Sequence, residues 1–154
     1  MYNADYGIIN YVLKTIGVIS QNKTWLSAPD TAMLSVIVVN VWKMFPYVML
    51  MIEAALQGVS KELKEAAVID GAGKFEIFRN VTWPAIAPQC YSVLLLMLVW
   101  TLNAFTFVYN LTGGGPAPST EVMAMYIYKK AFTDIDFGMA SAASTILFVI
   151  CMLI

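Results

Sequence analysis

The sequence predicts an all-α, polytopic transmembrane helix bundle, because the composition is strongly apolar and three long runs carry almost no charge. Hydrophobic residues make up 60% of the 154 residues and charged residues 12%, against roughly 45–50% and about 25% in soluble domains. Residues 31–52 contain one charge, Lys43, and residues 86–111 and 137–154 contain none. A helix over 31–52 is about 33 Å long at about 1.5 Å per residue. That length is enough to cross a hydrocarbon core about 30 Å thick.

Spans and loops are expected to alternate within one transmembrane domain over residues 1–154. An amphipathic segment over 6–17 precedes the first span. The polar stretch over 58–83 carries more Lys and Arg than any other, which places it on the cytoplasmic side by the positive-inside rule. The expected segments are a span over 31–56, a cytoplasmic loop over 58–83, a span over 86–111, an outer loop with a short helix over 112–136, and a span over 137–154.

Neither end of the chain resembles the natural end of a membrane bundle. The last apolar run reaches Ile154 without an interfacial Lys, Arg or Trp, and residues 1–5 have neither the basic nor the apolar part of a signal peptide. We therefore expect a bundle that is truncated at both ends, as a piece of a longer subunit.

Local signals divide the 58–83 loop into two short helices. Ser60 is a suitable N-cap for a helix over 61–69. Gly71 permits the backbone turn that ends this helix. A second short helix is expected over 74–80, and Pro84 is expected to open the next span at its first helical position.

The same loop contains a spaced motif. Glu65-Ala66-Ala67 is followed by three residues, Gly71, nine residues and Val-Thr-Trp-Pro ending at Pro84. This pattern resembles the cytoplasmic coupling loop of the membrane subunits of ABC-type importers. The resemblance implies that the loop contacts an ATPase through a set of six residues: Glu65, Ala66, Ala67, Asp70, Gly71 and Pro84.

A second series of residues follows the next span, beginning with Gly113-Gly114-Gly115-Pro116 and continuing to Ala142. It resembles the carbohydrate-uptake branch of ABC importer permeases, and within it the Gly-Gly-Gly-Pro-loop partner of the usual heterodimeric pair. The glycine triplet does not indicate nucleotide binding, because the Lys-Ser/Thr of a phosphate-binding loop is absent. We expect a tight outer turn, with Ser119 and Thr120 capping a short helix that runs to Phe132.

Polar and aromatic side chains in the spans are the candidates for a substrate path, since such groups usually face the interior of a membrane bundle. The resemblance implies that the two spans flanking the coupling loop line this path. Packing between helices is an alternative role for the same side chains. The candidates are Asn40, Lys43, Met44 and Tyr47 on the first span, and Trp100, Thr101 and Ala104 on the second.

Lys43 is the one charge inside the first span. Two roles are open for it: binding an anionic substrate such as a phosphate or uronate, or pairing with a carboxylate of a partner subunit.

The resemblance implies a permease subunit of an ATP-driven, binding-protein-dependent importer for sugars or related polyols and sugar phosphates, in the cell membrane. The implied partners are a second permease subunit, two cytoplasmic ABC ATPase subunits, an extracytoplasmic solute-binding protein, membrane lipid and a sugar-like substrate. The alternative is a non-transporting membrane scaffold or assembly protein derived from a permease fragment.

Several other classes of function are excluded or disfavoured. The chain has no histidine, which excludes Ser-His and Cys-His nucleophile systems and zinc-protease motifs. Cys90 and Cys151 lie within apolar runs and are expected to be buried small hydrophobes. A net charge of −1 does not favour nucleic-acid binding. We expect no catalytic residue, no metal site and no cofactor in this chain, with ATP bound by partner subunits.

Overall fold

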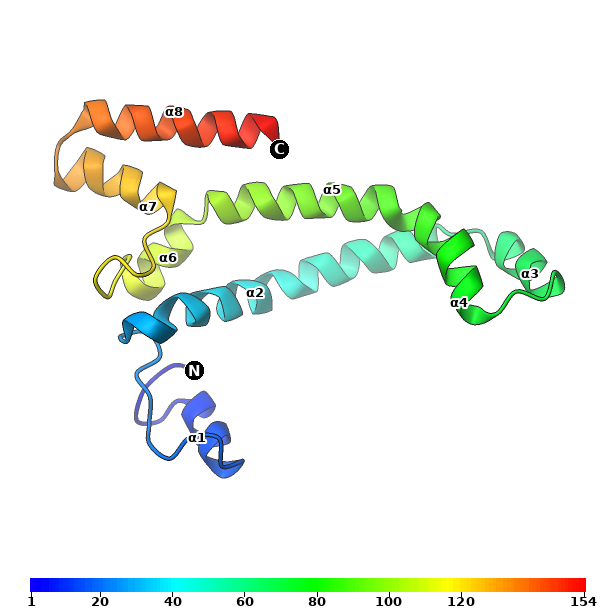
Figure 1. Cartoon of the computed structure of the whole chain (residues 1–154), viewed down its shortest axis with the longest axis horizontal. Coiled ribbons are helices and arrows are strands. Elements are labelled where there is room, and N and C mark those ends of the chain that lie inside the picture. Colours follow the sequence, from blue (N-terminus) through cyan, green and yellow to red (C-terminus); the bar gives the residue numbers. More distant parts are fainter. The chain divides into compact units, whose positions relative to one another are not determined.

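The computed structural model describes residues 1–154 and contains helices without strands, which confirms the all-α class (Figure 1). Two compact units are present: Met1–Val41 with Thr101–Ile154, and Trp42–Trp100. The helices, in chain order, are α1 Ile8–Thr15, α2 Pro29–Gln57, α3 Lys61–Ile69, α4 Lys74–Ile77, the π-helical turn η1 Phe78–Thr82, α5 Trp83–Leu102, α6 Phe105–Thr112, α7 Met123–Tyr128, the π-helical turn η2 Lys129–Thr133, and α8 Phe137–Leu153.

Two continuous helices are long and apolar enough to cross a bilayer: Pro29–Gln57 and Lys74–Leu102, each of 29 residues. The first contains the predicted span over 31–56. Only 11% of the most apolar window of each helix is buried, whereas the core helix of a soluble protein of this length would bury one face. Large apolar side chains such as Leu50 and Leu94 are exposed on these helices, as expected for surfaces that lipid or other membrane helices cover.

The second span begins earlier than predicted, and Pro84 does not open it. α4, η1 and α5 form one continuous helix from Lys74, and Pro84 lies inside that helix. The Trp83 N–H donates to the Phe78 carbonyl, a bond five residues long that widens the turn just before the proline. Proline lacks an N–H and its ring crowds the carbonyl four residues earlier. A π-turn at this point accommodates both effects without ending the helix.

The predicted single span over 86–111 is also wrong at its other end. α5 ends at Leu102, and Ala104 leaves the helical region with φ −76° and ψ 43° before α6 starts at Phe105. The ring of Phe105 lies 4.7 Å, centroid to centroid, from that of Tyr128 on α7. It also stacks on the ring of Tyr109 at 5.3 Å. Packing of α6 against α7 therefore accompanies the change of direction, and this contact cannot be read from an uninterrupted apolar run.

Thr120 organises the Gly-Gly-Gly-Pro loop rather than capping a helix, so that prediction is wrong. α7 begins at Met123, and its N-cap is Val122. The Thr120 side chain is fully buried. Its hydroxyl donates to the Gly115 carbonyl at 2.8 Å and lies 2.7 Å from the Thr112 hydroxyl. These bonds satisfy buried polar groups in a loop that has no regular backbone partners.

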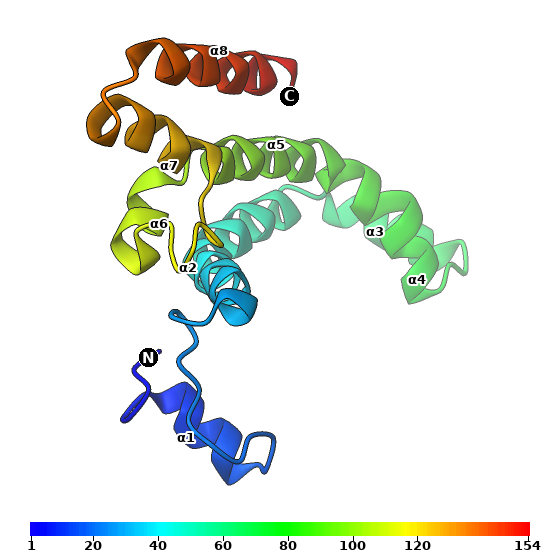
Figure 2. The same cartoon turned by 60° about the vertical axis from the view of Figure 1, so that its left-hand side comes forward.

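α7 and α8 lie side by side in both views, joined by the turn around Asp134 and Asp136 (Figures 1 and 2). Asp136 is the N-cap of α8, since its carboxylate accepts from the Met139 N–H at 2.9 Å. Lys130 donates to Asp134 at 2.7 Å. This hydrogen bond and the charge of Asp134 raise the pKa of the Lys130 ammonium.

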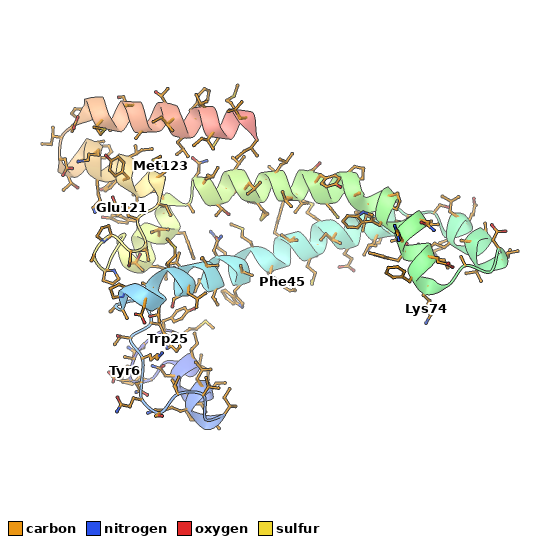
Figure 3. The ribbon with its side chains drawn as sticks, viewed as in Figure 1. Tyr6, Trp25, Phe45, Lys74, Glu121 and Met123 are labelled. Carbon is orange, nitrogen blue, oxygen red and sulfur yellow. The ribbon has the colours of Figure 1, made fainter.

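Asn10 holds the N-terminal segment together from a buried position. Its amide nitrogen donates to the carbonyls of Ala4 and Lys23 at 2.9 and 3.0 Å. Its amide oxygen accepts from the Trp25 indole N–H at 2.7 Å. Figure 3 labels Trp25 at this end of the chain. A single amide thus ties α1 to the segment that leads into α2.

Candidate functional site

The predicted coupling loop forms the end of the second unit, where the chain turns from α2 to α5. Ser60 caps α3, as predicted: its hydroxyl accepts from the Leu63 N–H at 3.3 Å. An N-cap hydroxyl satisfies one of the amide donors that have no partner inside the helix. The polar sequence therefore folds into a defined helix at the end of the long apolar segments.

Gly71 ends α3 in a turn that explains the spacing of the motif. Its φ is +82°, in the left-handed region that favours glycine. The Ala72 N–H donates to the Ala67 carbonyl and the Gly71 N–H to the Val68 carbonyl, both at 3.0 Å. This pair of bonds is the Schellman motif, in which glycine stands four residues after the acceptor of the longer bond. The interval from Ala67 to Gly71 is therefore the interval that this turn requires.

The second helix of the loop starts two residues later. The Gly73 N–H donates to the Glu76 carboxylate at 2.8 Å, so a side chain from the first turn of α4 satisfies the amide at its start. Lys74, labelled in Figure 3, begins the helix that continues without a break to Leu102. The loop is therefore continuous with a helix that is long and apolar enough to cross a membrane.

The surface of the loop is unusually apolar for a segment with so many charges. Ile69 is 85% exposed and Phe75 73% exposed, and Leu63 and Val68 are also exposed. Among the predicted contact residues, Ala67 is half-buried and the others are exposed: Glu65, Ala66, Asp70, Gly71 and Pro84. Sequence reasoning did not single out Ile69 and Phe75. The sequence alone could have indicated them, because both are large apolar residues in a loop that is predicted to lie in the cytoplasm.

A groove of about 460 Å³ lies in the same unit, where the loop joins the two long helices. Small residues dominate its walls, and they keep the end of α2 and the start of α5 from filling the space between them. The lining residues are Met51, Ala54, Ala55, Gly58, Val59, Ala85, Pro88 and Gln89. None of the predicted contact residues lines it, so the groove and the exposed loop surface are separate features.

The structure brings together two of the predicted path residues, Tyr47 and Trp100. Their ring centroids are 5.2 Å apart with planes inclined by 53°, a geometry in which aromatic rings attract each other. Lys43 and Met44 precede Tyr47 on α2 by four and three residues. Residues at these spacings share a helix face. Lys43 is exposed and Met44 is half-buried. Lys43 and Tyr47 are thus about one helical turn apart on α2, and the Tyr47 ring contacts the Trp100 ring on α5.

The other three predicted path residues belong to the first unit. Asn40 is half-buried on α2, and Thr101 is exposed on the last turn of α5. Ala104 is the N-cap of α6, and its N–H donates to the Thr101 carbonyl at 3.2 Å. Thr101 and Ala104 therefore flank the point where the second span breaks.

Sequence reasoning missed a cluster of four aromatic rings in this unit. The Tyr128 ring lies within 5.5 Å of three others, measured between centroids, and it joins α6 to α7 and η2. The four residues are Phe105, Tyr109, Tyr128 and Phe132. No group of three or more His, Cys, Asp or Glu side chains is placed to hold a metal ion.

Comparison with known proteins decides the family. A model described as the binding-protein-dependent transport system inner membrane component matches residues 7–154. The chain belongs to this family. It is therefore a multi-pass membrane protein, of a family whose curated members are permeases of ABC transporters, transport subunits rather than enzymes.

Two curated relatives show the range of this permease family. The trehalose/maltose transport system permease protein of Thermococcus litoralis is 36% identical over 152 residues, which are 99% of this chain and 50% of that protein. The sulfoquinovosyl glycerol transport system permease protein of Agrobacterium fabrum is 34% identical over 151 residues, 98% of this chain and 48% of that protein. The chain thus spans about half the length of the curated relatives it matches.

A solved structure shares the permease fold. The crystal structure of a bacterial alginate ABC transporter, in complex with an alginate pentasaccharide-bound periplasmic protein, matches with a TM-score of 0.83 at 24% identity. The match covers 99% of this chain and 52% of that chain. It confirms the membrane helix arrangement that the fold class predicts.

Proposed function

We propose that this chain is part of the permease subunit of an ATP-driven, binding-protein-dependent importer for sugars or related polyols and sugar phosphates. In this role it lines part of the translocation path and transmits the movement of cytoplasmic ATPase subunits to the membrane helices. The observation that carries the proposal is the motif loop, which folds as an exposed helix–turn–helix continuous with a membrane span.

The loop has the properties of a docking surface for another protein. Exposed Ile69 on α3 and Phe75 on α4 offer apolar area, and exposed Glu65 offers a charge on α3. Apolar anchors within a polar rim are typical of protein interfaces. Because α4 runs into α5 without interruption, a subunit that grips the loop can move the span as a rigid body. We assign Glu65, Ala66, Ala67, Asp70, Gly71 and Pro84 to this contact.

The substrate path is assigned to the residues on the two flanking spans. The Tyr47 and Trp100 rings provide flat apolar surface for a pyranose ring, and the Tyr47 hydroxyl can bond to sugar hydroxyls. We place Asn40, Lys43, Met44, Thr101 and Ala104 along the same path. The similar proteins described above are named for trehalose/maltose, for sulfoquinovosyl glycerol and for alginate, so family membership leaves the choice of substrate to the residues of each chain.

The remaining parts of the importer are supplied by partners in this proposal. A solute-binding protein delivers the substrate, a second permease subunit completes the path, and two ATPase subunits bind and hydrolyse ATP. The periplasmic protein in the alginate transporter complex supports the first of these. The chain itself holds no cofactor.

The test is sugar uptake and ATP hydrolysis, measured together in vesicles that contain the full-length subunit with its partners. Glu65→Lys is expected to lower uptake at least about tenfold, since it inverts a charge at the contact and charge inversion at an interface costs several kcal/mol. Asp5→Lys makes the same change in charge on the other side of the first span and should leave both activities unchanged.

Three results would count against the proposal. Coupled uptake by Glu65→Lys at the wild-type rate would remove the loop from the ATPase contact. An equal loss in both variants would point to a general effect of charge. Absence of uptake for every labelled carbohydrate, with all partners assembled, would favour the scaffold alternative.

A further inference from the structure

The helix α1 exposes an apolar stripe along one face. Ile8 and Val12 are four residues apart, and Ile16, the C-cap residue, follows at the same interval. Side chains at this interval share one face of a helix. The three are exposed by 51%, 46% and 63%, whereas a helix of a soluble domain turns such a stripe toward its core.

The opposite face of α1 is held by Asn10. At about 3.6 residues per turn, side chains two positions apart point in nearly opposite directions, and Asn10 is two residues from both Ile8 and Val12. The Asn10 side chain is buried, and it hydrogen-bonds to two backbone carbonyls and to the Trp25 indole N–H. These bonds fix the rotation of α1 about its own axis, so they determine that the stripe faces outward.

The same hydrogen bonds hold α1 close to the end of a membrane-spanning helix. Trp25 is four residues before Pro29 (29 − 25), where α2 begins. The Trp25 carbonyl accepts from the Thr31 hydroxyl at 2.9 Å, and the Tyr2 hydroxyl donates to the Ser35 carbonyl at 3.2 Å. In both views α1 runs across the first turns of α2 rather than along them (Figures 1 and 2). Because α2 crosses the bilayer, a helix held across its end lies along the membrane surface.

The residues around the stripe favour lipid as the partner. Tyr11, beside Val12, is 69% exposed, and Tyr6, just before the helix, is 85% exposed. Tyrosine and tryptophan are enriched at membrane–water boundaries, where an apolar ring and a polar tip suit the headgroup region. Lys14 is exposed and shares the face of Asn10, four residues earlier. An apolar face opposite a face that carries lysine is typical of helices that lie in the membrane interface.

We propose that α1 is an interfacial anchor, whose stripe of Ile8, Val12 and Ile16 inserts into the phospholipid leaflet at the Pro29 end of α2. The expected depth is about 5–10 Å into the boundary between headgroups and acyl chains. Lys14 is the one charged residue of α1, so the attraction is mainly apolar and does not require anionic lipid. This role goes beyond the proposed function, because it needs neither a substrate nor the ATPase.

The experiment measures the surroundings of a nitroxide spin label on α1. The full-length subunit is assembled with its partner subunits in phosphatidylcholine nanodiscs, with Cys90→Ala and Cys151→Ala as the background. Labels are attached at Val12→Cys and, as the matched control on the opposite face, at Lys14→Cys. Collisions of the label are measured with molecular oxygen, which concentrates among acyl chains, and with a polar nickel chelate, which stays in water.

The ratio of oxygen collisions to nickel collisions is expected to be about tenfold higher for the label at position 12 than at position 14. Tenfold corresponds to a difference of about 1.4 kcal/mol in the partition of the two reagents. The ratio at position 12 should be unchanged when phosphatidylglycerol is added, since the insertion does not depend on anionic lipid.

Two results at position 12 overturn the proposal. Frequent nickel collisions place the stripe in water. Infrequent collisions with both reagents place it against protein, either another membrane subunit or the binding protein.

A second measurement needs no variant to assemble. The wild-type complex is irradiated in nanodiscs that contain a phosphatidylcholine with a diazirine in its upper acyl chain, and the modified residues are mapped. Adducts are expected on the stripe and on exposed Leu34 of α2. Labelling of Leu34 without labelling of Ile8, Val12 or Ile16 overturns the proposal.

Discussion

Substitution of Gly71 tests whether the left-handed turn at the end of α3 is needed for the proposed coupling of ATP hydrolysis to uptake. Gly71 has a φ of +82°, and a Cβ built there meets no atom within 4 Å. A side chain at this position therefore costs backbone strain without a steric clash. A non-glycine residue in the left-handed region costs roughly 1–2 kcal/mol. Asparagine tolerates the region better than alanine does, and a β-branched residue is a marked outlier there.

In the proposed role, the strain becomes a loss of coupling, because the turn would have to be formed whenever the ATPase binds the loop. In the free loop, a substituted residue can leave the left-handed region and release the Ala72 and Gly71 hydrogen bonds to Ala67 and Val68. Docking then has to restore the turn, and it becomes weaker by the same roughly 1–2 kcal/mol, about a 5–30-fold change in the equilibrium. We expect coupled uptake to fall in the order Gly, Asn, Ala, Val, with the β-branched variant lowest.

The assay is uptake per ATP hydrolysed by the reconstituted full transporter, with the amount of assembled complex measured in the same vesicles. Gly73→Ala is the matched control. Gly73 has an extended backbone with φ −69°, and an added methyl group meets only the Glu76 carboxylate at 3.7 Å. Its coupling should stay close to that of wild type. Wild-type coupling by Gly71→Val, or equal losses in Gly71→Ala and Gly73→Ala, would refute the reasoning from the turn.

Two further substitutions test the structure of the first unit, each by the thermal midpoint of the purified complex in detergent. Thr120→Val removes a fully buried hydroxyl and leaves the Gly115 carbonyl without its donor. Thr120→Val should lower the free energy of unfolding by about 1–3 kcal/mol, whereas Thr106→Val, at an exposed position on α6, should change it little. Equal thermal midpoints for the two variants would contradict the stabilising role of the Thr120 hydrogen bonds. Asp136→Ala removes the cap of α8 and should lower the free energy of unfolding by about 0.5–2 kcal/mol, whereas Asp136→Asn retains a capping oxygen. An equal shift of the thermal midpoint in both variants would argue against the cap.

Much of the fold was predictable because it depends on short-range rules. The all-α class follows from composition and from the length of the apolar runs. The cap at Ser60 follows from the preference of N-cap positions for hydroxyl side chains. The left-handed turn at Gly71 follows from the freedom of glycine. Each of these rules involves residues within one or two helical turns.

The errors occurred where distant residues decide the local structure. Hydropathy does not distinguish a continuous span from one that breaks at Ala104, because the residues on both sides are uncharged and mostly apolar. Thr120 looks like a helix cap in sequence, but it bonds to Thr112 and Gly115 across a loop. Pro84 looks like a helix start, but a π-turn before it lets the helix continue. In each case the competing interaction is visible only once the chain is folded.

By itself, the sequence determined that this protein is helical and lies in a membrane, and its spaced motifs indicated the family. One interval in these motifs, from Ala67 to Gly71, follows from backbone geometry. The tertiary structure alone decided which side chains are in contact. The contact of Tyr47 with Trp100 joins two helices across the whole coupling loop, and the burial of Thr120 depends on α6, α7 and the loop between them. The physical reason is that hydropathy and capping act along the chain, whereas ring packing and buried hydrogen bonds depend on distances between elements that only the fold defines.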